Sequence, residues 1–255
     1  MMRTIIVVLT LLIMTPVYGL MVIIASLFGV ERRPGGIYEK APRWWAALAL
    51  RVGGVRVRLH NVERMQTGEP RIFVSNHVSW YDVWALAAVL PHAKFVGKAE
   101  LFRIPIFGRA ARASGMIAIQ RDNRKAAFES YRLAAERIGA GASVAVFPEG
   151  TRGRSYSLRQ FKKGPFVLAV AAGVPIVPTI VHGTLEVMSR DVFRVRSGVV
   201  DIHFLEPIDA SGLTYEDRNR LSREAWERMA EALHELYGIE SSESGAPGRE
   251  AAAAD

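Results

Sequence analysis

The strongest constraint on this chain is an uncharged run near its N-terminus, residues 4–30, which is 27 residues long. A helix needs about 20 apolar residues to cross the hydrocarbon core of a bilayer, and membrane helices tolerate interruptions such as Pro16 and Gly19. A cleaved signal peptide is the alternative, but its apolar core is only about 7–15 residues and ends in small residues. The run therefore predicts a membrane helix that either spans the bilayer or is embedded in it.

The charges around this run predict the side of the membrane on which the other residues lie. Arg3 alone precedes the run, whereas Arg32, Arg33, Lys40 and Arg43 follow it. The cytoplasmic flanks of membrane helices carry an excess of lysine and arginine. We therefore expect a cell-membrane protein whose main domain lies on the cytoplasmic side.

Composition narrows the chemistry that is available. The 255 residues include 33 Lys+Arg and 25 Asp+Glu, which gives a formal net charge of +8, and there is no cysteine. A basic chain suits anionic partners such as nucleic acid, acidic lipid headgroups or phosphorylated substrates. The missing thiol excludes disulfides, cysteine-ligated metals and a cysteine nucleophile.

After residue 54, short apolar runs alternate with amphipathic ones. This alternation is typical of an α/β fold with a mostly parallel central sheet flanked by helices. The expected strands are residues 55–60, 72–76, 94–97, 115–119, 143–147, 175–181 and 199–208, and the main helices are residues 81–90, 123–138, 165–173 and 214–238.

These patterns divide the chain into three regions. Residues 1–54 are an N-terminal membrane-anchoring helical segment, residues 55–240 an α/β domain, and residues 241–255 a small, polar tail that we expect to be disordered. Within the first region, residues 42–54 place two tryptophans in an apolar stretch flanked by arginines. That stretch suits either a helix at the membrane interface or the first packed helix of the domain.

The stretch VSNHVSWYDVW, residues 74–84, holds a histidine and an aspartate five positions apart, His77 and Asp82. In the plainest interpretation Ser79 and Asp82 form a capping box at a helix start, and His77 merely ends a strand. If the helix begins at Ser79, however, Asp82 in its first turn can reach back to His77 in the preceding loop. The carboxylate would then hold the imidazole in one tautomer, ready to take a proton from a hydroxyl. Capping and catalysis are compatible here.

Two further loops follow predicted strands. VFPEGTRGRS, residues 146–155, places Glu149 and Arg152 at the carboxyl end of a strand, where open α/β sheets have their ligand sites. An arginine there suits phosphate binding, and a salt-bridged surface turn is the alternative. VGKAELFRIPIFG, residues 96–108, places Lys98 directly after a strand, where a lone lysine usually faces solvent.

Taken together and in this order, NHVSWYD, GKAELFRIPIFG, FPEGTRGRS and VPIVPTIVHGT resemble the four motif blocks of the glycerolipid acyltransferase family. The likeness is greatest to its 1-acyl-sn-glycerol-3-phosphate acyltransferases and covers roughly residues 60–185. The resemblance implies transfer of a fatty acyl group from acyl-CoA or acyl-carrier protein to the sn-2 hydroxyl of 1-acyl-glycerol-3-phosphate. The product would be phosphatidic acid, made in phospholipid biosynthesis.

The resemblance also implies roles for individual residues. His77 matches the general base, Asp82 the acid that orients it, and Lys98 and Arg152 the groups that bind the acceptor phosphate. The resemblance implies that seven further residues of the motif blocks support the structure of the site: Asn76, Ser79, Glu149, Gly150, Thr151, Pro175 and Pro178.

The implied mechanism is direct attack by the acceptor hydroxyl, without an acyl-enzyme. This fits the missing cysteine and the absence of a G-x-S-x-G elbow, and a positioned base can contribute ~10²–10⁴-fold. The expected partners are a lysophospholipid, the acyl-CoA or acyl-carrier protein co-substrate and the bilayer. We expect no metal, because the histidines are scattered along the sequence, no other cofactor and no nucleic acid.

Two alternatives stay open. The same chemistry could act on a lyso-ornithine lipid, another lysophospholipid or glycerol-3-phosphate. A membrane-anchored binding protein without catalysis could instead use its basic face to hold anionic lipid or nucleic acid. Aromatic residues interleaved with basic ones would support RNA binding, but the lysines and arginines here fall in loops and on amphipathic helices.

Overall fold

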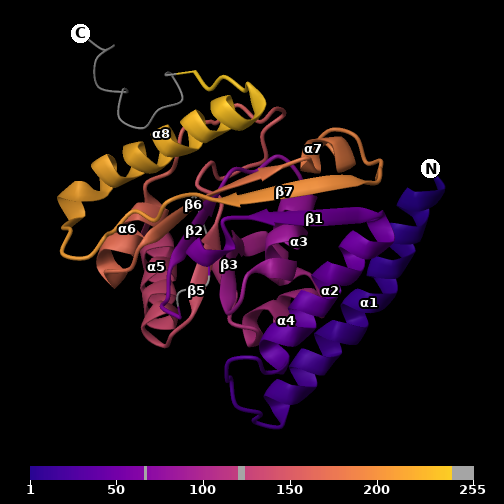
Figure 1. Ribbon diagram of the computed structural model, residues 1–255. Helices are drawn as coiled ribbons and strands as arrows, with labels where there is room; N and C mark the ends of the chain where they lie inside the picture. Colours follow the sequence, from indigo (N-terminus) through magenta and orange to yellow (C-terminus); the bar gives the residue numbers. More distant parts are fainter. Residues whose placement is uncertain (66–67, 120–123, 243–255) are drawn as a thin grey trace.

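A central sheet organises the domain (Figure 1). The computed structural model describes residues 1–65, 68–119 and 124–242, and within them the sheet has seven strands in the order β1-β7-β6-β2-β5-β3-β4. Neighbouring strands are parallel except β6 and β7, which are antiparallel. The predicted mostly parallel α/β fold is therefore confirmed. The strands are β1 (Val55–His60), β2 (Ile72–Ser75), β3 (Ala93–Lys98), β4 (Ile117–Ile119), β5 (Ser143–Val146), β6 (Ile176–His182) and β7 (Gly198–Phe204).

Helices cover both faces of the sheet. Figure 1 shows α5, α6 and α8 on one side and α1 to α4 on the other. The α-helices are α1 (Met2–Leu27), α2 (Ile37–Gly53), α3 (Trp80–Val89), α4 (Phe107–Ala113), α5 (Arg124–Gly139), α6 (Gly164–Ala172), α7 (Thr184–Val187) and α8 (Arg218–Tyr237). Short 3₁₀ turns are η1 (Val62–Arg64), η2 (Ala99–Arg103) and η3 (Tyr215–Asp217).

The alternation of side chains along the strands builds two cores. In β2, Ile72 and Val74 belong to the core beneath α5, α6 and α8, whereas Phe73 belongs to the core beneath α2 and α3. Successive strand residues point to opposite faces of a sheet, and both faces here are covered by helices. This is why the strands are continuously apolar, as parallel sheets require.

Most predicted boundaries differ from the structure by one or two residues, and two differ by four. The strand predicted over residues 199–208 ends at Phe204, and Ile208 adds only an isolated bridge to Ile176. The helix predicted over residues 214–238 opens as the 3₁₀ turn η3, because Thr214 and Asp217 form a capping box there. The predicted tail begins at Ser241, and residues 243–255 lie outside the described residues.

Helix α1 lies along the domain and contacts it in its first turn and again in its C-terminal half. Thr4 accepts a hydrogen bond at 3.0 Å from the backbone N–H of Val195. At Gly19 the helix comes so close to α4 that an added Cβ would lie 2.7 Å from a methyl of Ile106. The opposite face of α1 is exposed and apolar, and by length and composition the helix could cross a membrane.

Helix α2 contains residues 42–53 of the stretch that suggested either an interfacial or a packed helix. Its Ala46, Ala49 and Leu50 are buried in the core shared with α3, so it is a packed helix. Trp44 remains 46% exposed, on the side away from that core.

Candidate active site

His77 and Asp82 contact each other at the start of α3. His77 Nδ1 lies 2.8 Å from Asp82 Oδ2. Ser79 is the N-cap of α3, and its capping box with Asp82 is present. The same carboxylate oxygen accepts hydrogen bonds from the backbone N–H groups of Val78 and Ser79, at 2.7 and 2.8 Å. One carboxylate therefore caps the helix and contacts the imidazole at once.

Asp82 is fully buried, and hydrogen bonds offset the cost of burying its charge. Its second oxygen, Oδ1, accepts a hydrogen bond from the hydroxyl of Thr184, at the start of α7. Thr184 is also fully buried. The sequence did not reveal this contact, because the two residues are 102 positions apart and α7 is too short to leave a periodic pattern.

The loop after β5 fixes the position of His77. The backbone N–H of His77 donates to Glu149 Oε1 at 3.0 Å, and its carbonyl accepts from the N–H of Gly153 at 2.7 Å. The imidazole stacks on Phe147 with ring centroids 4.1 Å apart. Because Nδ1 is engaged by Asp82, Nε2 is the nitrogen left to exchange a proton with a ligand.

Glu149 supports this loop from a buried position. Its side chain is only 5% exposed, and burial raises the pKa of its carboxyl to about 7. The next residue, Gly150, has φ of 78°, a left-handed conformation that favours glycine and lets the chain turn sharply after Glu149.

The side chains predicted to bind phosphate line the same cavity as His77. This cavity has a volume of about 830 Å³, and Lys98, Gly150, Thr151 and Arg152 also line it. The guanidinium of Arg152 lies 5.1 Å from the ring centroid of Trp80, and burial together with Arg190 lowers its pKa. One opening thus combines an imidazole with two cationic side chains.

Most of the remaining cavity wall is apolar. Helix α1 contributes Val7 and Leu11, α3 contributes Trp84, and α4 contributes Phe107. The volume falls within the roughly 300–1,000 Å³ typical of small-molecule sites. The cavity can therefore hold a molecule that combines an anionic group with a long apolar part.

Comparison with known proteins agrees with this geometry. Residues 56–182 match the family model described as Acyltransferase. The chain is 34% identical over 197 residues to a 1-acyl-sn-glycerol-3-phosphate acyltransferase of Haemophilus influenzae, across 76% of this chain and 80% of that protein. The chain belongs to the acyltransferase family.

Other relatives show how far the similarity extends. A lyso-ornithine lipid O-acyltransferase of Pseudomonas aeruginosa is 31% identical over 223 residues, across 80% of this chain and 83% of that protein. The chain spans only 52% and 42% of the length of two chloroplast relatives, from Arabidopsis thaliana and Brassica napus. The crystal structure of the 1-acyl-sn-glycerophosphate acyltransferase PlsC of Thermotoga maritima has the same fold, with a TM-score of 0.78 at 24% identity, covering 94% of this chain and 97% of that one.

Four further supporting residues do not line the cavity: Asn76, Ser79, Pro175 and Pro178. Asn76 joins the end of β2 to β6, since its amide donates to the carbonyl of Val181 at 2.9 Å and accepts from that residue's N–H at 2.8 Å. The Ser79 hydroxyl donates to the carbonyl of Met188 at 2.6 Å. Pro175 accepts from the N–H of Ile72, and Pro178 lies opposite Val74 in β6.

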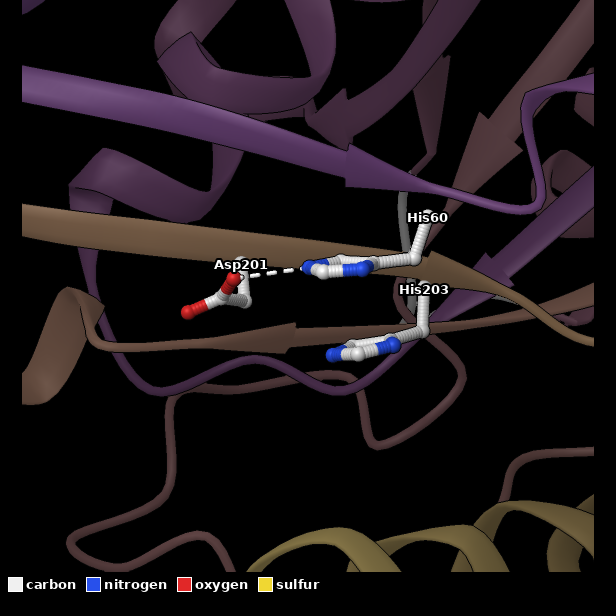
Figure 2. Close-up of side chains that lie close together, drawn as sticks. All are labelled: His60, Asp201 and His203. Atoms are coloured by element: carbon white, nitrogen blue, oxygen red, sulfur yellow. Dashed lines mark hydrogen bonds and ion pairs between the residues drawn. The ribbon is translucent and has the colours of Figure 1, made fainter.

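A second group of ionisable side chains lies outside the cavity of this acyltransferase (Figure 2). The ligand-type atoms of His60, Asp201 and His203 lie within 4.8 Å of one another, and the two imidazoles stack at 4.1 Å. The guanidinium of Arg58 already takes both oxygens of Asp201, at 2.8 and 2.7 Å, and His203 Nε2 lies 2.7 Å from the hydroxyl of Tyr237. We therefore interpret the group as an ion pair that joins β1, β7 and α8.

Proposed function

We propose that this protein transfers a fatty acyl group to the sn-2 hydroxyl of 1-acyl-glycerol-3-phosphate and forms phosphatidic acid. One observation carries the proposal: the His77–Asp82 pair faces a cavity that Lys98 and Arg152 also line. The names of several relatives, including the Haemophilus protein, support the same activity.

In this mechanism His77 acts as the general base. The acceptor hydroxyl gives its proton to Nε2, and its oxygen attacks the thioester carbonyl of the donor. The new C–O bond forms, the C–S bond breaks, and the leaving thiolate takes the proton from Nε2. Asp82 stabilises the imidazolium during the transfer, through the 2.8 Å contact with Nδ1.

Lys98 and Arg152 position the acceptor by binding its phosphate. A fixed phosphate brings the hydroxyl to the imidazole and turns a bimolecular encounter into a step within one complex. The apolar wall of the cavity takes an acyl chain, and the donor is acyl-CoA or acyl-carrier protein. No other cofactor and no metal enter the reaction.

We propose in addition that residues 1–54 anchor the protein on the cytoplasmic side of the cell membrane. Both halves of α1 contact the same domain, so a helix in this position lies along the domain instead of leading away from it. Its exposed apolar face would then be embedded in one leaflet. A lysolipid could pass from that leaflet into the cavity, which α1 itself lines.

A panel of acceptors with labelled acyl-CoA and acyl-carrier protein donors tests this function in purified protein. His77→Ala should lose nearly all transfer, and His234→Ala, an exposed histidine of α8, should keep it. Arg152→Ala should mainly raise KM for a phosphorylated acceptor. Labelling of phosphate-free lysolipids alone would reject the acceptor named here.

A second candidate acceptor has a specific observation in its favour. The Pseudomonas relative, similar over 80% of this chain, is named for acyl transfer to a lyso-ornithine lipid. The same panel separates the two, because that acceptor has no phosphate for Arg152 to bind. An Arg152→Ala variant with unchanged KM on a lyso-ornithine lipid, and no wild-type transfer to phosphorylated acceptors, would favour this second candidate.

A further inference from the structure

The loop between α7 and β7, residues 188–197, exposes two neighbouring apolar side chains. Val192 is 56% exposed and Phe193 is 70% exposed. Isolated exposed apolar residues are common on protein surfaces. In an adjacent valine and phenylalanine, however, exposure of apolar surface to water is unfavourable, and burial of that surface would be stabilising. The pair is flanked by three exposed arginines, Arg190, Arg194 and Arg196.

The charge of this loop is largely uncompensated. Its one acid, Asp191, is paired with Arg154 of the loop after β5, at 2.7 Å. In the described part of the chain, neither Arg194 nor Arg196 lies in an ion pair with an acidic side chain. The loop therefore presents apolar side chains within a field of positive charge.

The same loop lies beside the N-terminal end of α1. Val195 donates its backbone N–H to Thr4, which fixes the loop to the first turn of α1. Figure 1 shows the N-terminal end of α1 beside the segment that joins α7 to β7. Exposed apolar side chains of α1 begin at Met2, include Ile5 and Ile6, and continue along the helix. Phe193 also lines the cavity that holds His77.

We propose that residues 188–197 form a second membrane contact, in which Val192 and Phe193 insert into an anionic bilayer. Arg190, Arg194 and Arg196 bind the acidic headgroups around them. A lipid surface is the partner because the exposed apolar pair lies beside the N-terminal end of a helix whose exposed face is itself apolar. The inference rests on the membrane attachment of α1 given under the proposed function.

The contact has a consequence for the active site. Arg190 donates to the backbone carbonyl of Arg152 at 2.6 Å, so the loop and the phosphate-binding arginine are directly joined. With the loop in the headgroup layer, an anionic lysolipid moves from the bilayer to Arg152 along a basic, partly apolar surface. The acceptor then enters the cavity from the membrane side, past Phe193.

The chain has no cysteine, so single cysteines allow clean nitroxide labelling of the full-length protein in vesicles. The three variants are Phe193→Cys, Leu12→Cys on the exposed face of α1, and Glu227→Cys on the exposed side of α8. In vesicles of phosphatidylcholine with phosphatidylglycerol, labels at 193 and 12 should be more accessible to oxygen than to a water-soluble nickel chelate. The label at 227 should show the reverse.

The pattern of results separates this inference from membrane attachment through α1. If the label at 193 is as exposed to the chelate as the label at 227, while the label at 12 is protected, the loop contact alone is overturned. Chelate exposure at both 193 and 12 would overturn the loop contact and the attachment of α1 together. Neither result depends on whether the protein transfers acyl groups.

The anionic character of the partner is tested with charge variants. Removal of one basic contact should weaken attraction to an acidic surface about fivefold. Protection of the label at 193 should therefore fall in Arg194→Gln/Arg196→Gln, and in vesicles of phosphatidylcholine alone. Arg220→Gln/Arg223→Gln on α8 should leave it unchanged. Equal protection in both vesicle types would overturn the assignment of an anionic partner.

Discussion

At the scale of single residues, Thr184 completes the set of donors around Asp82. Its hydroxyl is the hydrogen-bond donor to Asp82 Oδ1, and both side chains are fully buried. Thr184→Val replaces the hydroxyl by a methyl group of similar shape and leaves a buried charge with one donor fewer, at a cost of ~1–3 kcal/mol. We expect kcat to fall roughly tenfold or more with little change in KM, because the hydroxyl orients the base without touching substrate. Steady-state kinetics of Thr184→Val and Thr184→Ser check this; the serine variant should recover most of the rate.

Glu149 gives a second prediction, on stability. Its usual pKa of 4.5 is raised to about 7 by burial. Between these values the folded state binds a proton that the unfolded chain has lost, so the ionised carboxylate reduces stability as pH rises through this window. Glu149→Gln should therefore be more stable than the wild type at pH 8, by on the order of 2 kcal/mol, with the difference vanishing near pH 4. Thermal unfolding in detergent at both pH values measures it, and a constant difference would contradict the prediction.

Local spacing explains which site residues were predictable. The contact between His77 and Asp82 follows from a helix that starts at Ser79, and all three lie within six positions. Phe147, which stacks on His77, and Thr184 were not predicted. Phe147 follows β5 and Thr184 follows β6, and only the order of the strands in the sheet brings them to the site. Local sequence spacing does not encode that order.

At the scale of elements, the turn between β6 and α7 depends on Gly183. Its φ is +95°, and an added Cβ would lie 2.1 Å from the carbonyl oxygen of Val199 in β7. Gly183→Ala must therefore displace β7 and would move Thr184 away from Asp82. Gly173→Ala is a matched control, because Gly173 has φ of +63° with nothing within 4 Å.

Gly173→Ala should lower the free energy of unfolding only by the conformational strain at that position, about 1–2 kcal/mol. Gly183→Ala should cost clearly more and should also lower kcat. Denaturant unfolding and acyl transfer of the two variants provide the comparison. Equal destabilisation, with activity retained in both, would show that the close approach to β7 is unimportant.

Element types were easier to predict than element ends. The strands and long helices follow from runs of apolar residues whose period matches the structure that they form. The end of β7 at Phe204 depends on where its pairing with β6 stops, at Thr179, and the 3₁₀ start before α8 depends on the cap at Thr214. Helix α7 has four residues, about one turn, which is too few to show a period.

At the scale of the whole molecule, the order of the strands in the sheet could not be predicted from the sequence. β1 is the first strand of the chain, yet it pairs with β7, the last, and this places His60 directly opposite His203. The ion pair between Arg58 and Asp201 then joins the two strands at the edge of the sheet. Histidines scattered along the sequence thus meet only when the sheet is complete.

The final prediction concerns His203, which lies in this junction of β1, β7 and α8. Burial, with His60 as a positively charged neighbour when protonated, lowers the pKa of His203 from 6.5 to about 4. Between these values the unfolded chain binds a proton that the folded state does not, so His203 costs stability as pH falls from about 6.5 to about 4 and nothing above that window. His203→Gln removes this titration, and a glutamine can keep a hydrogen bond to Tyr237.

On acidification from pH 8 to pH 5, the melting temperature of His203→Gln should therefore fall by several degrees less than that of the wild type. His234→Gln is the matched control, since this histidine is exposed on α8 and its ion pair with Glu240 is a surface pair that contributes little. Calorimetry of the three proteins at both pH values checks the difference. Parallel losses in all three would mean that the junction of β1, β7 and α8 keeps its stability when His203 is protonated, contrary to the burial that the structure shows.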